Sequence, residues 1–318
     1  MKNKIENVSI IMSVKNGEKY LVRAIESIIN QSFRNFEFII INNDSNDGTF
    51  EILENYKNKD SRIKILVNSN NETLYDGRTT GIKEAKFDWF ALMDADDECH
   101  IDRIQKQVDF INNNHNENLA VVSTYGKYVD HESKTIAYRS SGPINLEDFK
   151  NMYLNNESFT LIDPSIIIKK KVFFELGGYL KNNIAADLDF FYRVAENGYL
   201  IQTINNPLYY YRIHETSYSI KNSMKQCEVT HFINFNMRQR RSGKSQITEK
   251  QFYSDYWSKF SYRMPRKILD YSKTYYKIST YAFAKKRYFV FLFNFIIAFF
   301  FSPKFISKKI YQHLFKKD

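Results

Sequence analysis

The chain contains few cysteines and few of the residues that interrupt regular structure. Its 318 residues include only 2 Cys, 10 Gly and 5 Pro. Cys99 and Cys227 are too few and too far apart for a zinc-type cysteine cluster or a disulfide framework, and they fit a reducing compartment. The scarcity of Gly and Pro argues against long flexible linkers. At this length we expect one large globular domain or two ordinary ones.

The N-terminus has no apolar run of the length that a signal peptide requires. The run from residue 8 to residue 14 ends at Lys15, and no small-residue cleavage site follows it. We therefore expect a cytoplasmic protein.

Acidic residues are scarce in the last third of the chain. Residues 221–318 hold 21 Lys and Arg but only 5 Asp and Glu, a balance of +16, whereas residues 1–220 hold 25 and 31, a balance of −6. The asymmetry predicts two regions, of which the second faces an anionic partner. Because the front is acidic and no recognition motif is present, we expect no nucleic-acid partner.

Short apolar runs and helical patterns alternate over roughly the first 125 residues. Strands are predicted at 8–14, 36–41, 63–67, 89–93 and 120–125, and helices at 17–31, 49–56, 78–86 and 102–112. The alternation predicts an α/β fold with a mostly parallel sheet. Polar clusters at 13–16, 42–47 and 94–98 follow three of these strands. Since ligands bind at the carboxyl ends of parallel strands, the three clusters should converge.

The pattern changes after residue 140. We expect a strand at 161–168, a short helix at 171–176 and a helix at 187–196 that ends at Gly198. Beyond about residue 221 the sequence is helical, aromatic and basic.

Four stretches of the chain resemble family 2 glycosyltransferases of the GT-A fold, of the type that builds capsules, lipopolysaccharides and other cell-surface glycans. They begin "VSIIMSVKNGEKY", "RTTGIKEAKFDWFALMDADDE", "AADLDFFYRVAENG" and "YYYRIHETSYS". The resemblance covers residues 7 to about 220, so we expect a catalytic domain at 1–220 and a basic helical region at 221–318. It implies an inverting enzyme that uses a nucleotide-diphosphate sugar with Mn²⁺ or Mg²⁺.

The acids at 94–98 lie where that family carries its DXD element. A hard divalent cation held by carboxylates neutralises the diphosphate of a sugar donor. The resemblance implies that Asp97 binds the metal, that Asp96 binds the ribose or the metal, that Ala95 lies against the donor, and that Asp94 stiffens the turn. The alternative is a solvated acidic loop in which Asp102 caps the next helix.

Other positions resemble the family's nucleotide site. Ser13, Val14, Lys15 and Asn16 correspond to its first nucleotide loop, although Lys15 replaces a frequent aromatic residue. Asn43 stands where the family has an acid that contacts the base, and it can still accept from the N3–H of uracil. Arg78 stands where an arginine often binds the nucleotide or diphosphate. The alternatives are an ordinary strand-to-helix turn and a surface arginine.

The remaining candidates concern the transfer step and the acceptor. Asp187, near a helix start, is the implied general base, because an inverting transfer needs a carboxylate to deprotonate the acceptor hydroxyl. A purely structural cap by Asp187 or Asp189 is the alternative. His214 resembles a late histidine that joins the metal or the diphosphate, although a lone histidine is usually structural. The stretches 163–165 and 177–179 are expected to shape the acceptor side.

The most apolar segment is "YFVFLFNFIIAFFF" at 288–301. Fourteen helical residues would span about 21 Å, which is short of the ~30 Å hydrocarbon core of a bilayer. Lys285, Lys286 and Arg287 precede it, and Lys304, Lys308 and Lys309 follow it. These flanks predict an interfacial helix on anionic lipid, with a buried core helix as the alternative.

Together these features predict an inverting glycosyltransferase, peripheral on the inner face of the cell membrane. It would transfer sugar from a UDP-sugar to a hydroxyl of a cell-surface glycan or lipid-linked acceptor. A non-catalytic nucleotide- or glycan-binding scaffold is the first alternative, because Lys15, Asn43, Thr79 and Ala186 depart from the family pattern. A nucleotidyltransferase is the second, but residues 13–18 lack a Gly-rich phosphate loop.

Overall fold

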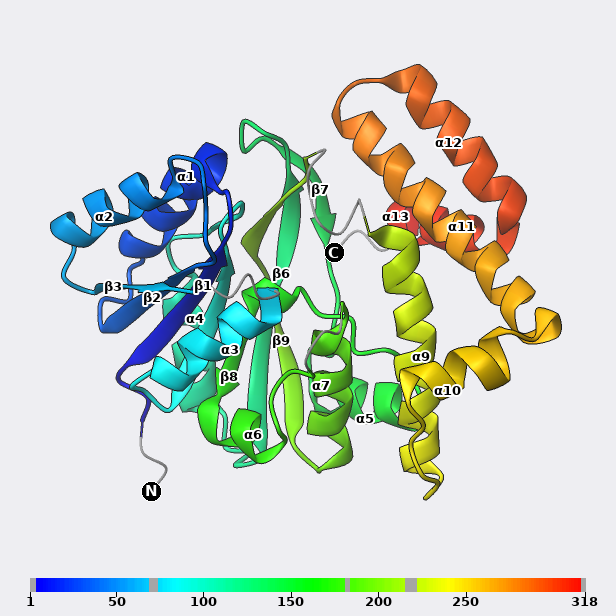
Figure 1. Cartoon of the computed structure of the whole chain (residues 1–318), viewed down its shortest axis with the longest axis horizontal. Coiled ribbons are helices and arrows are strands. Elements are labelled where there is room, and N and C mark those ends of the chain that lie inside the picture. Colours follow the sequence, from blue (N-terminus) through cyan, green and yellow to red (C-terminus); the bar gives the residue numbers. More distant parts are fainter. Residues whose placement is uncertain (1–3, 69–73, 181–183, 215–221, 316–318) are drawn as a thin grey trace. The chain divides into compact units, whose positions relative to one another are not determined.

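The computed structural model describes residues 4–68, 74–180, 184–214 and 222–315 (Figure 1). The chain divides into two compact units, residues 1–212 and residues 213–318. The sequence pattern placed this boundary near residue 220. The first unit contains the sheet, and the second is helical.

The described part of the first unit is built on a nine-stranded sheet. Its spatial order is β3-β2-β1-β4-β8-β6-β9-β5, with β7 paired to β6. The strands are β1 (Val8–Val14), β2 (Phe36–Asn42), β3 (Ile63–Val67), β4 (Trp89–Asp94), β5 (Glu98–Cys99), β6 (Leu119–Val129), β7 (Thr135–Arg139), β8 (Ile167–Lys169) and β9 (Leu200–Arg212).

The direction of the chain across the sheet reverses at β1. Strands β2 and β3 extend from one side of β1, whereas β4 pairs with its other side, and all of these pairs are parallel. Strand β8 runs antiparallel to both β4 and β6, while β6 and β9 are again parallel. The carboxyl ends of β1 and β4 therefore form a topological switch point, where open α/β sheets bind ligands.

Helices cover both faces of this sheet. Helices α1 (Glu18–Ile29), α2 (Thr49–Lys59) and α4 (Arg103–Asn113) pack on the face that carries Ile10, Met12, Phe38 and Ile40. Helices α3 (Leu74–Glu84), α6 (Lys170–Glu175) and α7 (Ala186–Glu196) lie on the other side, toward the viewer in Figure 1. Alternate residues of each strand supply the two cores, as the two-residue period of a strand requires.

Helix α3 lies unusually close to the strands. A Cβ added at Gly81 would come within 2.5 Å of Ile41 Cδ1 and 2.8 Å of Ile11 Cγ2. Such distances are impossible for real atoms without a shift, so glycine permits the close packing.

The prediction for the first 125 residues is confirmed, and the later prediction is partly wrong. Residues 161–168 were expected to form one strand, but Asp163–Ser165 form a 3₁₀ turn, η1, and only Ile167–Lys169 form a strand. Pro164 lacks the N–H that a continuous strand needs. The sequence pattern also missed β9, thirteen residues long, and α5 (Leu146–Leu154).

The second unit consists of helices in its described part. They are α9 (Ser223–Arg241), α10 (Glu249–Phe252), a π-helical turn η2 (Tyr253–Trp257), α11 (Phe260–Ala284), α12 (Tyr288–Phe301) and α13 (Pro303–Phe315). Helix α12 runs along α11 (Figure 1), and Ser272 Oγ donates a 2.7 Å hydrogen bond to the Ala298 carbonyl. Helix α11 contains Pro265 in its first two turns.

Among the described residues, no single helix has both the length and the hydropathy of a membrane span. Helix α12 and residues 303–311 meet the length and composition criteria only when taken together, and the pair is bent by 119°.

Candidate active site

The three polar clusters that follow β1, β2 and β4 meet at the switch point. Ser13 is the register partner of Asp94 across β1 and β4, and Val14 is the partner of Asn42 across β1 and β2. The expected convergence is therefore confirmed for the backbone. Its cause is the parallel pairing, which brings the carboxyl ends of adjacent strands to one edge.

The loops after β1 and β2 are joined by hydrogen bonds. The Asn16 amide donates to Ser45 Oγ at 2.9 Å, and Asn16 Oδ1 accepts from the Asn46 amide at 2.9 Å. Asn16 has a φ of 53°, a left-handed conformation that asparagine tolerates better than most residues. Lys15 and Asn16 are exposed, so the side chains predicted to meet the nucleotide lie at an open surface.

Asn43 lies beneath this surface in a polar group with Ser13. Its Nδ2 donates to Ser13 Oγ at 2.6 Å, and its Oδ1 accepts from Asn68 Nδ2 at 3.3 Å. A Cβ at Gly77 would come within 2.6 Å of Ser13 Oγ and 2.7 Å of Asn43 Oδ1. Glycine at position 77 thus allows α3 to pack directly against Asn43 and Ser13.

The acids after β4 form a compact cluster. Carboxylate oxygens of Asp94, Asp96 and Asp97 lie within 4.8 Å of one another. Asp97 is buried, and its Oδ1 accepts from the Arg212 amide at 2.7 Å. Its Oδ2 is also buried and has no hydrogen-bond partner among the described residues. Burial, reinforced by the charges of Asp96 and Asp94, raises the pKa of Asp97 well above its usual range.

This cluster has the donor chemistry of a site for a divalent cation. Oxygen ligands suit Mg²⁺ and Mn²⁺, and a buried carboxylate oxygen without a partner is costly unless something cationic approaches it. The residues therefore fit a hard metal ion, held first by Asp97. In the alternative of a solvated loop Asp97 would be exposed, whereas only 2% of its surface is accessible.

Arg212 fixes the acidic turn, and sequence reasoning did not assign it a role. Its backbone amide binds Asp97, its Nε donates to the Asp96 carbonyl at 2.8 Å, and its guanidinium pairs with Glu98. It is fully buried, and its guanidinium lies 4.9 Å from the ring centroid of Tyr20. The available signal was an arginine two residues before His214, at the end of an aromatic run.

Arg78 lies within the protein, away from an open surface. Only 1% of it is accessible, and its guanidinium pairs with Asp94 at 2.5 Å and with Asp163. It therefore joins the acidic turn to η1. A direct contact between Arg78 and a nucleotide stays a prediction. Through Arg78, Asp94 is linked to η1, and its expected role in stiffening the turn stays a prediction.

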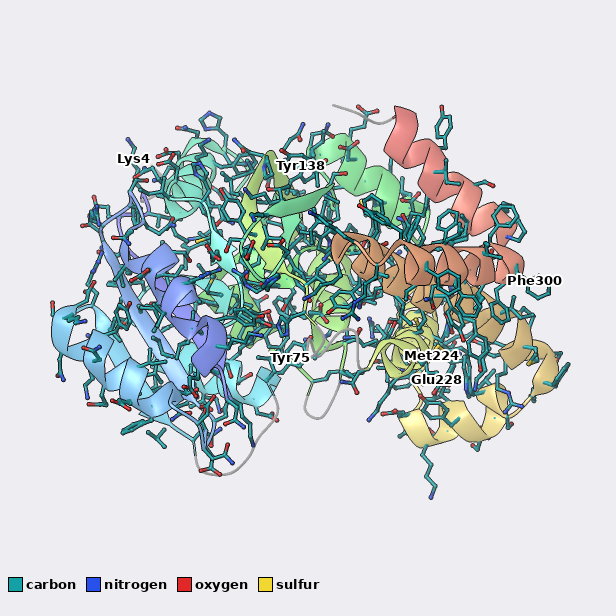
Figure 2. The ribbon with its side chains drawn as sticks, turned by 90° about the horizontal axis from the view of Figure 1, so that it is seen from above. Lys4, Tyr75, Tyr138, Met224, Glu228 and Phe300 are labelled. Atoms are coloured by element: carbon teal, nitrogen blue, oxygen red, sulfur yellow. The ribbon has the colours of Figure 1, made fainter. Side chains whose placement is uncertain are left out.

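Asp187 lies in the first turn of α7 and accepts a hydrogen bond from the Tyr75 hydroxyl at 3.0 Å. Tyr75 belongs to α3 and is labelled in Figure 2. Burial raises the pKa of Asp187, although the Tyr75 hydrogen bond opposes this. The N-cap of α7 is Ala185, so Asp187 is not the capping residue, and Asp189 is bound instead by Arg193 at 2.7 Å.

Two further polar side chains, Tyr179 and Asp163, lie near Asp187. The Tyr179 ring lies 5.0 Å from that of Tyr75, and its hydroxyl has no hydrogen-bond partner within the described chain. Burial raises the pKa of Asp163 to about 7, even though Arg78 opposes the shift, and the charge of Asp187 adds to it. Both residues come from the stretches expected to shape the acceptor side.

His214 is the second residue of the second unit, which begins at Ile213. Its predicted contact with the metal or the diphosphate stays a prediction. Within the first unit the structure brings together Ser13, Asn43, Asp94, Asp96 and Asp97 at the strand ends, and Asp187 with Tyr75 at the facing ends of α7 and α3.

The sequence matches the profile of Glycosyl transferase family 2 over residues 9–177. Two relatives are named as uncharacterized glycosyltransferases. One, from Haemophilus influenzae, is 37% identical over 38% of this chain and 46% of its own length. The other, from Methanocaldococcus jannaschii, is 31% identical over 65% of this chain and 70% of its own length. The O-antigen biosynthesis glycosyltransferase WbnJ of Escherichia coli is 27% identical over 72% and 93%.

Solved structures with the same fold include the following two. Staphylococcus aureus TarS, residues 1–349 with UDP-GlcNAc, superposes with a TM-score of 0.57 at 17% identity over 96% of this chain and 92% of that one. The mannosyltransferase PcManGT of Pyrobaculum calidifontis, with GDP-Man and Mn²⁺, gives a TM-score of 0.58 at 12% identity over 100% and 89%. At these identities the likeness concerns the fold.

Proposed function

We propose a reaction for this chain, which belongs to glycosyl transferase family 2 and has the GT-A fold. It transfers a sugar from a nucleotide-diphosphate donor to a hydroxyl of a cell-surface glycan. The observation that carries the proposal is the buried acidic turn at the switch point of the sheet, with Asp97 Oδ2 unpaired. A donor diphosphate carries the charge that a cation on this turn would neutralise.

Asp97 and Asp96 would hold Mn²⁺ or Mg²⁺. When bound, the metal would supply positive charge to the diphosphate and its leaving group. The chain itself would contribute the rest of the donor site. The hydrogen-bonded loops after β1 and β2 would border it, with the polar side chains of Ser13 and Asn43 beneath them. Asn43 offers an oxygen to a base N–H, which supports uridine.

Asp187 would act as the general base of an inverting transfer. Its side chain is oriented by the Tyr75 hydroxyl, and its raised pKa brings it closer to working pH, where a base combines adequate ionisation with adequate proton affinity. Proton removal by Asp187 would accompany attack of the acceptor oxygen on the anomeric carbon, on the face opposite the departing nucleoside diphosphate.

The acceptor proposed is a glycan or lipid-linked glycan at the inner face of the cell membrane. The support is the O-antigen relative, together with the basic second unit, whose sequence favours an anionic membrane surface.

A catalytically inactive binding protein is the second candidate. It is favoured by Asn43, an amide already bonded to Ser13 and Asn68 at a position where the family carries an acid. Ala186 before Asp187 and Thr79 after Arg78 are departures of the same kind.

Release of nucleoside diphosphate from a panel of UDP- and GDP-sugars, with and without Mn²⁺, separates the two candidates. We expect Mn²⁺-dependent release from one donor class, increased by a membrane glycan extract. Donor binding without release by the folded protein, under all these conditions, would favour the binding protein.

A further inference from the structure

Helix α12 exposes large apolar side chains and buries its one amide side chain, Asn294, together with Ala298. Phe289 is 84% exposed and Phe300 81% exposed, whereas Asn294 is 8% exposed and Ala298 is fully buried. Surface helices of water-soluble proteins show the opposite arrangement, with the polar face outward. Figure 2 shows Phe300 projecting outward from its helix.

The exposed side chains form one stripe. Phe289, Phe293, Ile296 and Phe300 are spaced as i, i+4, i+7 and i+11, which places them on a single helical face, and Leu292 and Phe299 widen it. Asn294 does not interrupt the stripe, because its side-chain amide donates to the Val290 carbonyl of its own helix at 2.7 Å.

The opposite side of α12 is held by α11, which fixes the direction of the stripe. Ser272 Oγ bonds the Ala298 carbonyl at 2.7 Å, and the ring of Phe301 stacks on Tyr271 and Tyr275 with centroids 5.3 Å and 6.0 Å apart. The stripe therefore cannot turn inward without breaking this packing.

Cations border the stripe at both ends. Lys286 and Arg287 are exposed immediately before α12, and Lys304 and Lys308 are exposed on α13. The sequence contains no Asp or Glu between residues 271 and 317. The surface thus combines an apolar centre with a border whose charged residues are all basic.

We propose that the stripe of α12 inserts into one leaflet of an anionic lipid bilayer, with the helix parallel to the surface and its basic rim among the headgroups. A helix of this length covers about 21 Å, too little to cross ~30 Å of hydrocarbon, and the 119° bend to α13 turns the chain away from a straight continuation. A second copy of the chain fits less well, because two identical positive rims would repel each other.

This inference specifies how the chain of the proposed function would bind a membrane, and it does not depend on the transfer chemistry.

The test uses the full chain, sedimented with vesicles of phosphatidylcholine alone or mixed with phosphatidylglycerol. We expect binding to the anionic vesicles, weakened by salt because the rim acts electrostatically. F289S/F300S should lower the partition coefficient by about tenfold or more. The matched control Y138S/L154S removes two side chains of similar exposure, 74% and 73%, from the first unit and should bind as the wild type does.

Three outcomes overturn the proposal: no binding of the wild type to anionic vesicles, equal binding by F289S/F300S, or a concentration-dependent dimer that F289S/F300S dissolves. Should F289S/F300S fail to fold, F300W keeps the apolar surface and provides a second measurement. Its added fluorescence should be quenched by lipids brominated on the acyl chain, and an unquenched signal contradicts insertion. Nucleoside diphosphate release in solution stays intact if only this inference fails.

An independent observation concerns Arg78, whose single positive charge is shared by two carboxylates. Its guanidinium binds Asp94 on one side and Asp163 on the other, and all three groups are largely removed from water. The η1 turn that carries Asp163 is itself held, because Arg103 donates to the Pro164 carbonyl at 3.1 Å and the Ser165 and Ser123 hydroxyls form a 3.0 Å hydrogen bond.

We infer that Asp163 is a positioning residue for the metal site, which it influences through Arg78. By taking part of the charge of Arg78, it leaves Asp94 with net negative charge to offer to a cation beside Asp96 and Asp97. Without Asp163, Arg78 would neutralise Asp94 alone, and the cluster would attract a cation less strongly.

This second inference rests on the proposed metal site, and Mn²⁺ titration of the protein without donor tests it. At pH 8, D163N should raise the Kd for Mn²⁺ by about tenfold, a loss of ~1.4 kcal/mol, while D163E, which keeps the charge, changes it less. The matched control D60N removes the carboxylate of another Arg pair, Asp60–Arg62, and should leave the Kd unchanged.

An unchanged Kd in D163N overturns the positioning role, as does an equal rise in D163N and D163E. Absence of Mn²⁺ binding in the wild type contradicts the metal site itself, so the two failures are distinguishable.

Discussion

At the scale of single residues, Asp187 is predicted to carry proton transfer. D187N should lower the rate of sugar transfer by about 10²- to 10⁴-fold, because an amide cannot accept the proton. Donor affinity should remain within a factor of about two, since the role of Asp187 concerns the acceptor. Steady-state release of nucleoside diphosphate, together with donor titration, measures both quantities.

The pH profile provides the companion test. A base works when deprotonated, so activity should rise with pH through the pKa of Asp187, and burial moves that pKa upward from its ordinary value. Removing the Tyr75 hydrogen bond, which opposes the shift, in Y75F should move the acidic limb to higher pH still. If Y75F leaves the acidic limb of the pH–activity profile where it is in the wild type, that limb does not report the ionisation of Asp187.

Asp97 should control the response of stability to metal. Since burial raises its folded-state pKa above the unfolded value, the folded chain binds this proton more tightly, and stability falls as pH rises between the two values. At neutral pH this carboxyl therefore contributes less to the stability of the metal-free fold than it does at low pH. D97N should melt no lower than the wild type without metal, and it should lose the increase in Tm that Mn²⁺ produces by mass action.

Sequence reasoning at this scale identified residues next to strand ends but not the contacts that hold them. The position of Asp97 and Asn43 at the ligand edge of the sheet could be predicted because each follows a strand of a parallel sheet. Arg212, Tyr75 and the pair Arg78–Asp163 depend on contacts between distant segments, which no local pattern encodes.

At the scale of elements, the close approach of α3 to β1 and β2 is a consequence of Gly81. G81A should destabilise the protein by about 1–3 kcal/mol, because a methyl group would collide with Ile41 and Ile11 in a packed core. K83A, on the exposed side of the same helix, is the matched control and should change the free energy of unfolding by less than about 0.5 kcal/mol. Urea unfolding followed by circular dichroism measures both, and equal effects would contradict the packing account.

Elements were predictable where one periodicity persisted. The strands from β1 to β4 are buried apolar runs between amphipathic helices, and each was identified within a few residues. The later half failed where tertiary contacts prevail: η1 interrupts an apolar run at Pro164, and β9 is a strand because β6 pairs along it, although its sequence includes Pro207 and several polar residues.

At the scale of the whole molecule, the two compact units provide separate reporters. The chain has two tryptophans, Trp89 in β4 of the first unit and Trp257 in η2 of the second. In W257F the remaining fluorescence comes from Trp89, so its change on heating reports the unfolding of the first unit. In W89F it comes from Trp257 and reports the unfolding of the second unit. Mn²⁺ with UDP should raise the midpoint reported by Trp89 more than that reported by Trp257, because the proposed ligands lie in the first unit. Equal shifts would show that the units unfold together.

The division of charge was readable from the sequence alone, since the basic second unit and the acidic first unit differ in composition. The direction of the α12 stripe was not, because every residue of that helix except Asn294 is apolar or aromatic and only its packing on α11 decides which face remains exposed.

The central claim is that the turn after β4 holds a divalent cation that carries the donor's diphosphate. Calorimetric titration of UDP into the full chain, with Mn²⁺ and then with EDTA, tests it most directly in the wild type, D97N and D60N. The account predicts UDP binding that requires Mn²⁺ in the wild type and D60N and that is at least about tenfold weaker in D97N. UDP binding of equal strength with EDTA, or in D97N with Mn²⁺, would contradict it.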